Sequence, residues 1–245
     1  ASNAIELPVV VPEVQSPCLV PGLNLANDAV GDSAVPLPGT DLISLNIAEP
    51  QEIDGKLLVQ IKVDALANPP PGTMYAALFH TPDQPLSNPN DSFVGMVADV
   101  GGVSYVYGHR NEEVVGIAVI QTYVIDGELD PASDFNPDGT ISLVVPHATF
   151  MLEPGDRLGV ISANVHTGAL SSGQHIVRST NTLDSAESSQ PYVLRSASFC
   201  IANTAPLARL LASPLSGKAP LKVMLDASAS SDAEDAIVEY SFDPG

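Results

Sequence analysis

Tryptophan is absent from this chain of 245 residues, and all aromatic residues together make up 5% of it. Flat aromatic side chains do most of the stacking on sugar rings, so their scarcity argues against strong sugar binding. Basic residues are scarce too, because nine Lys and Arg stand against 29 Asp and Glu, for a formal net charge of −20. Such a surface repels phosphate backbones and anionic lipids, so we expect no nucleic-acid partner and no membrane insertion. The acidic excess either keeps the protein soluble or supplies Ca²⁺ ligands, and composition alone leaves both readings open.

Long hydrophobic runs are also missing, since no apolar stretch approaches the 18 or so residues of a membrane-spanning helix. The chain opens Ala-Ser-Asn-Ala, without the basic start and apolar core of a signal peptide, which predicts a mature product or an excised piece. We interpret residues 1–17 as a tag remnant followed by a Pro-rich linker without periodicity.

The chain has two cysteines, Cys18 and Cys200, near the two ends of the candidate main domain. In an oxidising compartment, a bridge between them would close a very long loop and contribute about 4 to 5 kcal/mol of stability in the chain-entropy model. The alternative is two unrelated buried thiols. We predict the disulfide.

Short apolar or alternating runs recur between turn signals from residue 18 to residue 203. The segment 56–63, Lys-Leu-Leu-Val-Gln-Ile-Lys-Val, alternates polar and apolar residues over most of its length, which is typical of a strand with one face in a core. Turn signals such as Asp-Gly at 54–55, Gly-Gly at 101–102 and Pro-Asp-Gly at 137–139 separate the runs. No long stretch keeps helical spacing. The pattern predicts an all-β, antiparallel β-sandwich of jelly-roll type over residues 18–203.

Residues 204–245 carry three further motifs. They are a Ser-Gly-Lys-Ala-Pro-Leu turn and strand at 216–221, an Asp-Ala-Ser-Ala-Ser-Ser-Asp loop at 226–232, and Tyr-Ser-Phe-Asp at 240–243. Together they resemble the N-terminal part of a PKD repeat, an immunoglobulin-like sandwich of secreted and cell-surface proteins. The resemblance implies an incomplete immunoglobulin-like domain beside the main one. PKD repeats mostly serve as spacers or adhesive modules, so any specific function is expected upstream.

The main domain contains six further segments with a shared pattern, at 21–23, 27–32, 41–50, 56–63, 104–108 and 138–146. In these segments it resembles sandwich domains that accompany PKD repeats in large secreted bacterial proteins, including subtilisin-like proteases. That type is in turn similar to DOMON-like and xylanase-associated carbohydrate-binding sandwiches, which open with an Asp-x-x-Gly-Asp loop and a later Asp-Leu strand start.

The opening loop is the best chemical candidate in the chain. Asp28, Asp32 and Asp41 would converge if the loop folded back on the next strand, with Gly31 permitting the tight backbone and Asn27 adding an oxygen. Ca²⁺ prefers such hard oxygen ligands in flexible geometry, so we predict a Ca²⁺ site there. The alternative is a network of Asx turns in which each Asp accepts local N–H groups and no metal is needed.

Other motifs are weaker. The segment 134–139 matches the first half of an EF-hand loop, but its twelfth position is Val145 and a strand-like run follows, so a hairpin turn is favoured. Ser33 lacks the flanking residues of a protease nucleophile. The five histidines have no zinc-site spacing and are expected at isolated turn or strand-end positions: His80, His109, His147, His166 and His175.

Four tyrosines could form a ligand platform, although their place within apolar runs favours core packing: Tyr75, Tyr105, Tyr107 and Tyr123. The sequence therefore predicts a noncatalytic accessory module of a larger secreted or cell-surface bacterial protein, stabilised by Ca²⁺. Its expected roles are binding a polysaccharide or surface protein, or spacing neighbouring domains of the same polypeptide. The alternative is a fragment of a secreted hydrolase with an active site on the sandwich.

Overall fold

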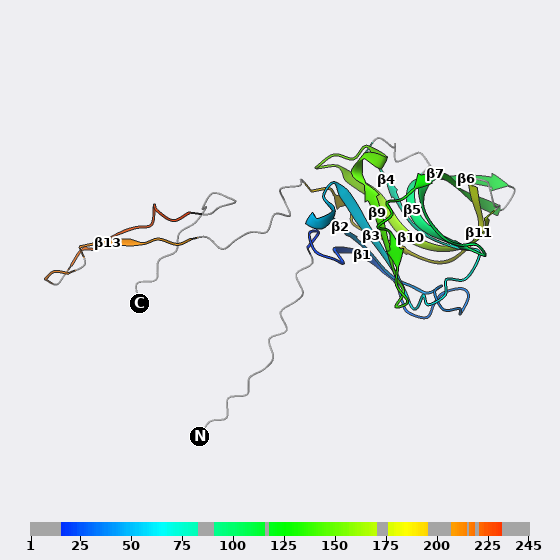
Figure 1. Cartoon of the computed structure of the whole chain (residues 1–245), viewed down its shortest axis with the longest axis horizontal. Helices are drawn as coiled ribbons and strands as arrows, with labels where there is room; N and C mark the ends of the chain where they lie inside the picture. The colour runs from blue at the N-terminus through cyan, green and yellow to red at the C-terminus, as the bar shows by residue number, and fades with distance from the viewer. Residues whose placement is uncertain are drawn as a thin grey trace, which may run out of the picture. The chain divides into compact units, whose positions relative to one another are not determined.

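The computed structural model describes residues 16–82, 91–115, 118–170, 176–195, 207–214, 216–218 and 221–231, with the side chains of 112–120 and 168–180 left out (Figure 1). The chain divides into two compact units, Ala1–Cys200 and Ile201–Gly245, close to the predicted boundary. The first 15 residues, Cys200, His175 and the Tyr-Ser-Phe-Asp motif at 240–243 lie outside the described residues.

The all-β prediction is confirmed. Strand pairings throughout the described residues are antiparallel. Helical structure there is limited to two short 3₁₀ turns, η1 (Gln51–Ile53) and η2 (His147–Phe150). None of the helices in this part of the chain has the length and apolar character needed to cross a membrane.

The first sheet of the larger unit has five strands. In spatial order they are β1 (Leu23–Asn27), β2 (Leu42–Ala48), β3 (Lys56–Val63), β9 (Thr140–Pro146) and β8 (Asp134–Phe135). The alternation in β3 points Leu57, Val59 and Ile61 to one face, where all three are fully buried. β3 lies between β2 and β9 and pairs with both, so the predicted strand is central to this sheet.

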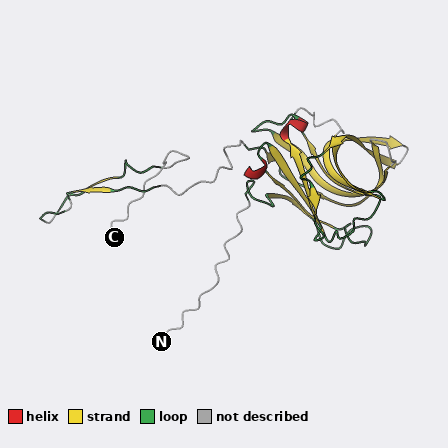
Figure 2. Ribbon diagram, in the orientation of Figure 1, coloured by secondary structure: helices red, strands yellow, loops and turns green. Residues whose placement is uncertain are grey.

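The second sheet has seven strands. In spatial order they are β11 (Ile176–Glu187), β7 (Ala118–Glu128), β6 (Gly102–Val115), β5 (Asp91–Asp99), β4 (Thr73–His80), β10 (Arg157–Leu170) and β12 (Tyr192–Val193). β10 also pairs with β11, so the strands from β11 through β10 close into a ring of six. Figure 2 shows these strands curving round on themselves.

The ring gives the larger unit two hydrophobic cores. Tyr75 and Phe79 on β4 face the main core between the two sheets. Met74 and Leu78 face the opposite way and pack with Tyr123 of β7 in a second core. Because successive side chains of a strand point to opposite faces, this second core fills the interior of the ring. A strand buried on both faces has to be apolar throughout, which accounts for the near-continuous Met-Tyr-Ala-Ala-Leu-Phe run of β4.

Two predicted hairpin turns are confirmed. β5 turns into β6 through Val100 and Gly101, and Gly102 has a φ of +129°, a conformation that favours glycine. The segment 134–139 forms the β8–β9 hairpin, in which Asp138 Oδ1 accepts the Thr140 N–H at 2.9 Å. A strand follows where an EF-hand requires a helix.

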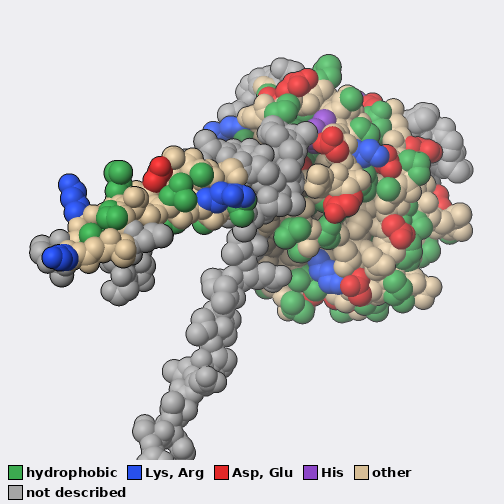
Figure 3. All heavy atoms as spheres, turned by 60° about the vertical axis from the view of Figure 1, so that its left-hand side comes forward, with side chains coloured by type: hydrophobic (Ala, Val, Ile, Leu, Met, Phe, Trp, Pro, Cys, Tyr) green, Lys and Arg blue, Asp and Glu red, His purple; other side chains and the backbone are tan. Residues whose placement is uncertain are grey.

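The smaller unit contains the hairpin of β13 (Leu211–Ser213) and β14 (Met224–Asp226). Its apolar side chains are largely exposed, including Leu211 at 66% and Met224 at 72%. Figure 3 shows Lys and Arg side chains among them, and on the face of the larger unit seen there both carboxylates and basic side chains. The jelly-roll and immunoglobulin-like details stay predictions.

Candidate metal centre

The loop between β1 and β2, residues 28–41, lies against β11 of the opposite sheet. Its backbone makes one direct bond to that strand, from the Ala34 N–H to the Leu183 carbonyl at 2.9 Å. At the end of the loop, the Leu42 N–H donates to Asp184 Oδ2 at 2.7 Å. These two bonds join β1–β2 to β11, although 142 positions separate Leu42 from Asp184 in the chain.

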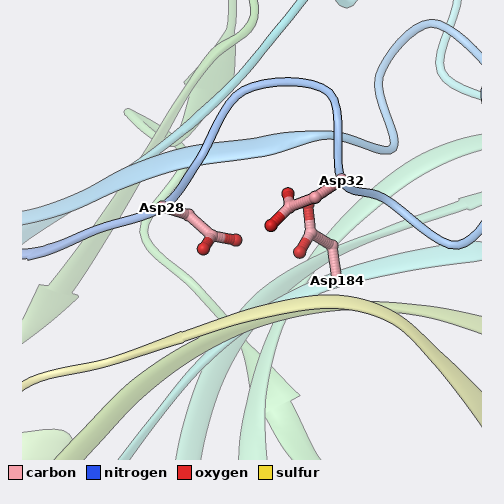
Figure 4. A group of neighbouring side chains, drawn as sticks. All are labelled: Asp28, Asp32 and Asp184. Atoms are coloured by element: carbon pink, nitrogen blue, oxygen red, sulfur yellow. The ribbon is translucent and has the colours of Figure 1, made fainter.

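Three carboxylates meet where the loop lies on β11. Asp28 follows β1, Asp32 lies in the loop, and Asp184 projects from β11 (Figure 4). One oxygen from each lies within 4.8 Å of the other two. The side chains point toward a common centre, so they could share one cation.

The electrostatics of the group favour a positive charge at that centre. Burial raises the pKa of the Asp184 carboxyl, and the nearby Asp28 carboxyl raises it further. Asp28 Oδ2 is shielded from solvent and receives no N–H or O–H donor from the described residues. Carboxylates this close repel one another unless a proton or a cation lies between them.

The structure brings together two of the four residues predicted for the site. Asp28 and Asp32 do converge, but the carboxylate of Asp41 accepts the N–H groups of Gly31, at 2.8 and 2.9 Å, and of Ser33, at 3.3 Å. Asp41 therefore organises the loop from within, as in the Asx-turn alternative. The Asn27 side chain is turned to Asn24, and its Nδ2 donates a hydrogen bond to Asn24 Oδ1 at 2.6 Å.

Sequence reasoning missed Asp184. This residue is a lone acid in the polar, alternating segment Thr-Leu-Asp-Ser-Ala at 182–186, where an exposed strand position is the ordinary expectation. Its neighbours Leu183 and Ala186 are buried in the main core. Only the docking of the loop on β11 gives the carboxylate its partners.

A second polar cluster lies at one end of the ring. Asp91 of β5 pairs with His80 Nε2 of β4 at 2.5 Å and with the Arg110 guanidinium of β6. His80 is 6% and Asp91 5% exposed, so the pair is almost closed to solvent. Beside it, Val160 on β10 has a φ of +47°, a strained value for a β-branched residue, within an irregularity of the β10–β4 register.

The interior of the ring also contains a buried histidine. His166 of β10 is 0% exposed, and its Nε2 lies 2.6 Å from the Tyr123 hydroxyl. Burial, helped by the Arg110 charge, lowers the pKa of His166 from 6.5 to about 4. The imidazole is therefore neutral at ordinary pH. The expectation of an isolated turn or strand-end position is wrong for His166, because the ring encloses the middle of β10.

A third cluster surrounds Glu49, just after β2. Its Oε1 accepts the Tyr192 hydroxyl at 2.8 Å and the Arg195 N–H at 2.9 Å, and its Oε2 lies 3.6 Å from His147 Nε2. Burial and the Glu49 charge both raise the pKa of Tyr192. The cluster joins the end of β2 to β12 and to the chain that follows it.

The tyrosine platform is not supported. Tyr75 and Tyr123 are each 0% exposed, on opposite faces of the second sheet. Tyr105 and Tyr107 are partly buried and pack against the main core. Their apolar environment directs these rings inward, so they offer no common surface to a ligand.

The predicted disulfide stays a prediction. Cys18 lies half-buried in the turn before β1. Its predicted partner Cys200 is outside the described residues.

Comparison with family models, curated proteins and solved structures finds no match for this chain.

Proposed function

We propose that this protein is a noncatalytic accessory module of a larger secreted or cell-surface protein, stabilised by a Ca²⁺ ion held by Asp28, Asp32 and Asp184. One observation carries the proposed calcium site: three carboxylate oxygens, two from the loop 28–41 and one from β11, lie within 4.8 Å of one another. Ca²⁺ takes six to eight hard oxygen ligands in flexible geometry, so carbonyl and water oxygens would complete the set that these carboxylates begin.

The position of the proposed site favours a role in stabilising the fold over a role in acting on a substrate. Asp184 also accepts the Leu42 N–H, and the same loop makes a backbone bond to β11. A cation that neutralises the three carboxylates would strengthen the connection between the two sheets. The division of the chain into two compact units supports a modular setting.

The buried His80–Asp91 pair is the arrangement closest to the hydrolase alternative. Asp91 is shared with Arg110, however, and both members of the pair are almost closed to solvent. A general base has to be within reach of the proton that it removes from a substrate. The pair is better suited to joining β4, β5 and β6, which supports the noncatalytic reading.

Thermal unfolding with and without Ca²⁺ tests the proposal. At 100 times its dissociation constant, a ligand that binds only the folded state adds about 2.7 kcal/mol. For a domain of this size, that gain corresponds to a rise in Tm of roughly 5–10 °C. We expect Ca²⁺ to raise the Tm of the wild-type protein, and chelator to reverse the rise.

The Asp184→Asn variant separates metal binding from charge relief. The pKa of Asp184 is raised in the folded state, so its ionised form at neutral pH opposes folding when no cation is bound. In chelator, Asp184→Asn is expected to match or exceed the Tm of the wild-type protein, and in Ca²⁺ to fall below it. Asp54→Asn changes the same charge at an exposed turn and should keep the full response to Ca²⁺. Equal Tm values for the wild-type protein in Ca²⁺ and in chelator would overturn the metal site.

A further inference from the structure

Two hollows adjoin the loop 28–41 beside the metal centre. The first has a volume of about 290 Å³, and Asp41 and Asp64 are among its lining residues. The second, of about 420 Å³, is lined by Leu37, Pro38, Ala65, Ala67, Asn68 and Pro70. The first lies at the small end of the range for ligand pockets, roughly 300–1,000 Å³, and therefore fits one side chain better than a whole ligand. Leu37 and Pro38 line both hollows and so join them.

The first hollow is negatively charged. Asp41 is only 7% exposed, and Asp64 Oδ1 accepts the Gly39 N–H at 2.8 Å, which leaves its other oxygen free of that bond. Neither Lys nor Arg is among the described residues that line the two hollows. No cation of the described lining balances these two charges: the Asp41 carboxylate accepts backbone N–H groups of the loop, and Asp64 is exposed.

A buried hydroxyl lies beneath the same loop. Tyr75 is 0% exposed, and its hydroxyl has no hydrogen-bond partner among the described residues. A Cβ added at Gly39 would come within 3.2 Å of it, so the hydroxyl lies directly under the backbone between Pro38 and Thr40. Burial and the Asp64 charge raise the pKa of Tyr75. A buried polar group without a partner is uncommon, and this one lies beneath Gly39, between the lining residues Pro38 and Thr40.

We propose that the two hollows bind an extended partner peptide, with a lysine or arginine side chain in the first hollow and an apolar side chain in the second. The exposed carboxylate of Asp64 suits a cationic head, with the Asp41 charge behind it, and Val35, Leu37 and Pro38 suit its methylene stem. The net charge of −20 attracts such a peptide over a distance. Neither hollow has an aromatic lining residue on which a sugar ring could stack. This assignment rests on the proposed role as an accessory module, to which it adds peptide binding, and does not depend on calcium.

Leu37 and Pro38 line both hollows, so neighbouring side chains on the same side of one peptide are the simplest pair to enter both. In an extended peptide, residues i and i+2 point to the same side. The probe is therefore the blocked peptide acetyl-Gly-Lys-Ser-Leu-Gly-amide. A matched peptide with norleucine in place of lysine keeps the methylene stem and removes the charge.

The experiment is an amide NMR titration of the full chain with each peptide at low salt. We expect the lysine peptide, at millimolar concentrations, to shift the signals of Gly39, Thr40 and Ala67. Added salt should weaken the binding because part of the attraction is between exposed charges. Equal binding of the norleucine peptide, or shifts that lie away from the two hollows, would overturn the proposal.

Asp64→Asn tests the carboxylate without removing the loop contact, because the Asn oxygen can still accept the Gly39 N–H. We expect this variant to bind the lysine peptide at least about fivefold more weakly. Asp99→Asn is the matched control, because Asp99 Oδ1 likewise accepts a loop N–H, from Gly101, and lies in the β5–β6 turn. Unchanged affinity in Asp64→Asn would refute the assignment. If the wild-type protein does not bind the lysine peptide but its Tm still rises with Ca²⁺, the peptide site is refuted and the metal site stands. If it binds the peptide but its Tm does not respond to Ca²⁺, the metal site is refuted and the peptide site stands.

Discussion

His166 makes the stability of the larger unit depend on pH in a way that can be calculated. Its pKa is lowered from 6.5 to about 4 in the folded protein, chiefly by burial. Between pH 6.5 and pH 4, His166 therefore binds a proton in the unfolded chain but stays neutral in the folded chain. A group with a lowered folded pKa contributes stability that is present above its unfolded pKa and is lost as the pH falls toward its folded pKa. The stability lost in this way amounts to roughly 3 kcal/mol, and the loss is complete below about pH 4.

Urea unfolding at a series of pH values from neutral to acid measures this loss. Carboxylates also titrate as the pH falls, so the useful quantity is the difference between the wild-type protein and a variant. In His166→Gln, the side chain stays polar and can still meet the Tyr123 hydroxyl, but it no longer titrates. We expect the free energy of unfolding of this variant to fall by about 3 kcal/mol less than that of the wild-type protein between neutral pH and pH 4.

Tyr123→Phe is the matched control. It removes the hydrogen bond to His166 but leaves the imidazole enclosed in the ring. We expect it to lose about 1–2 kcal/mol at every pH and to keep most of the wild-type pH dependence, because burial is the main cause of the lowered pKa. Parallel pH curves for the wild-type protein and His166→Gln would refute the reasoning.

Two further predictions concern the ends of the larger unit. Tyr192→Phe removes a buried hydroxyl that donates to the Glu49 carboxylate, so we expect the free energy of unfolding, measured in urea, to fall by about 1.5–3 kcal/mol. The control Tyr105→Phe changes a partly buried tyrosine and should change this free energy little. Equal losses in the two variants would contradict the role of the bond. If Cys18 and Cys200 are bridged, the intact mass rises by about 2 Da on reduction, and thiol labelling of the folded, unreduced protein would disprove the bridge.

Local pattern was enough to predict much of the fold. The alternation of segment 56–63 predicted β3, because side chains two apart share a face and one face has to be apolar to be buried. Gly101-Gly102 and Pro137-Asp138-Gly139 predicted hairpin turns, because their backbone requirements are met by neighbouring residues alone. The same locality explains why Asp28 and Asp32 were found, since both belong to one short loop.

The closure of the ring was beyond such reasoning. β10 is long enough to pair with β4 on one side and β11 on the other, but nothing in its sequence indicates which strands it pairs with. Closure gives β4 its second buried face, and it encloses His166 and Tyr123 where a sandwich strand would present an open surface. A strand pattern reports that a face is buried and does not report what covers it.

The sequence by itself determined the class of structure, the positions of most turns, and the acidity of the loop 28–41, because these depend on the chemistry of residues close together in the chain. The tertiary structure alone decided which acids meet. It placed Asp184 beside Asp28 and Asp32, turned Asp41 to backbone N–H groups, and fully buried Tyr75 and Tyr123, two of the four tyrosines of the predicted platform. Ligand sets and buried charges depend on distances in space, and strands far apart in the chain set those distances only when the two sheets pack together.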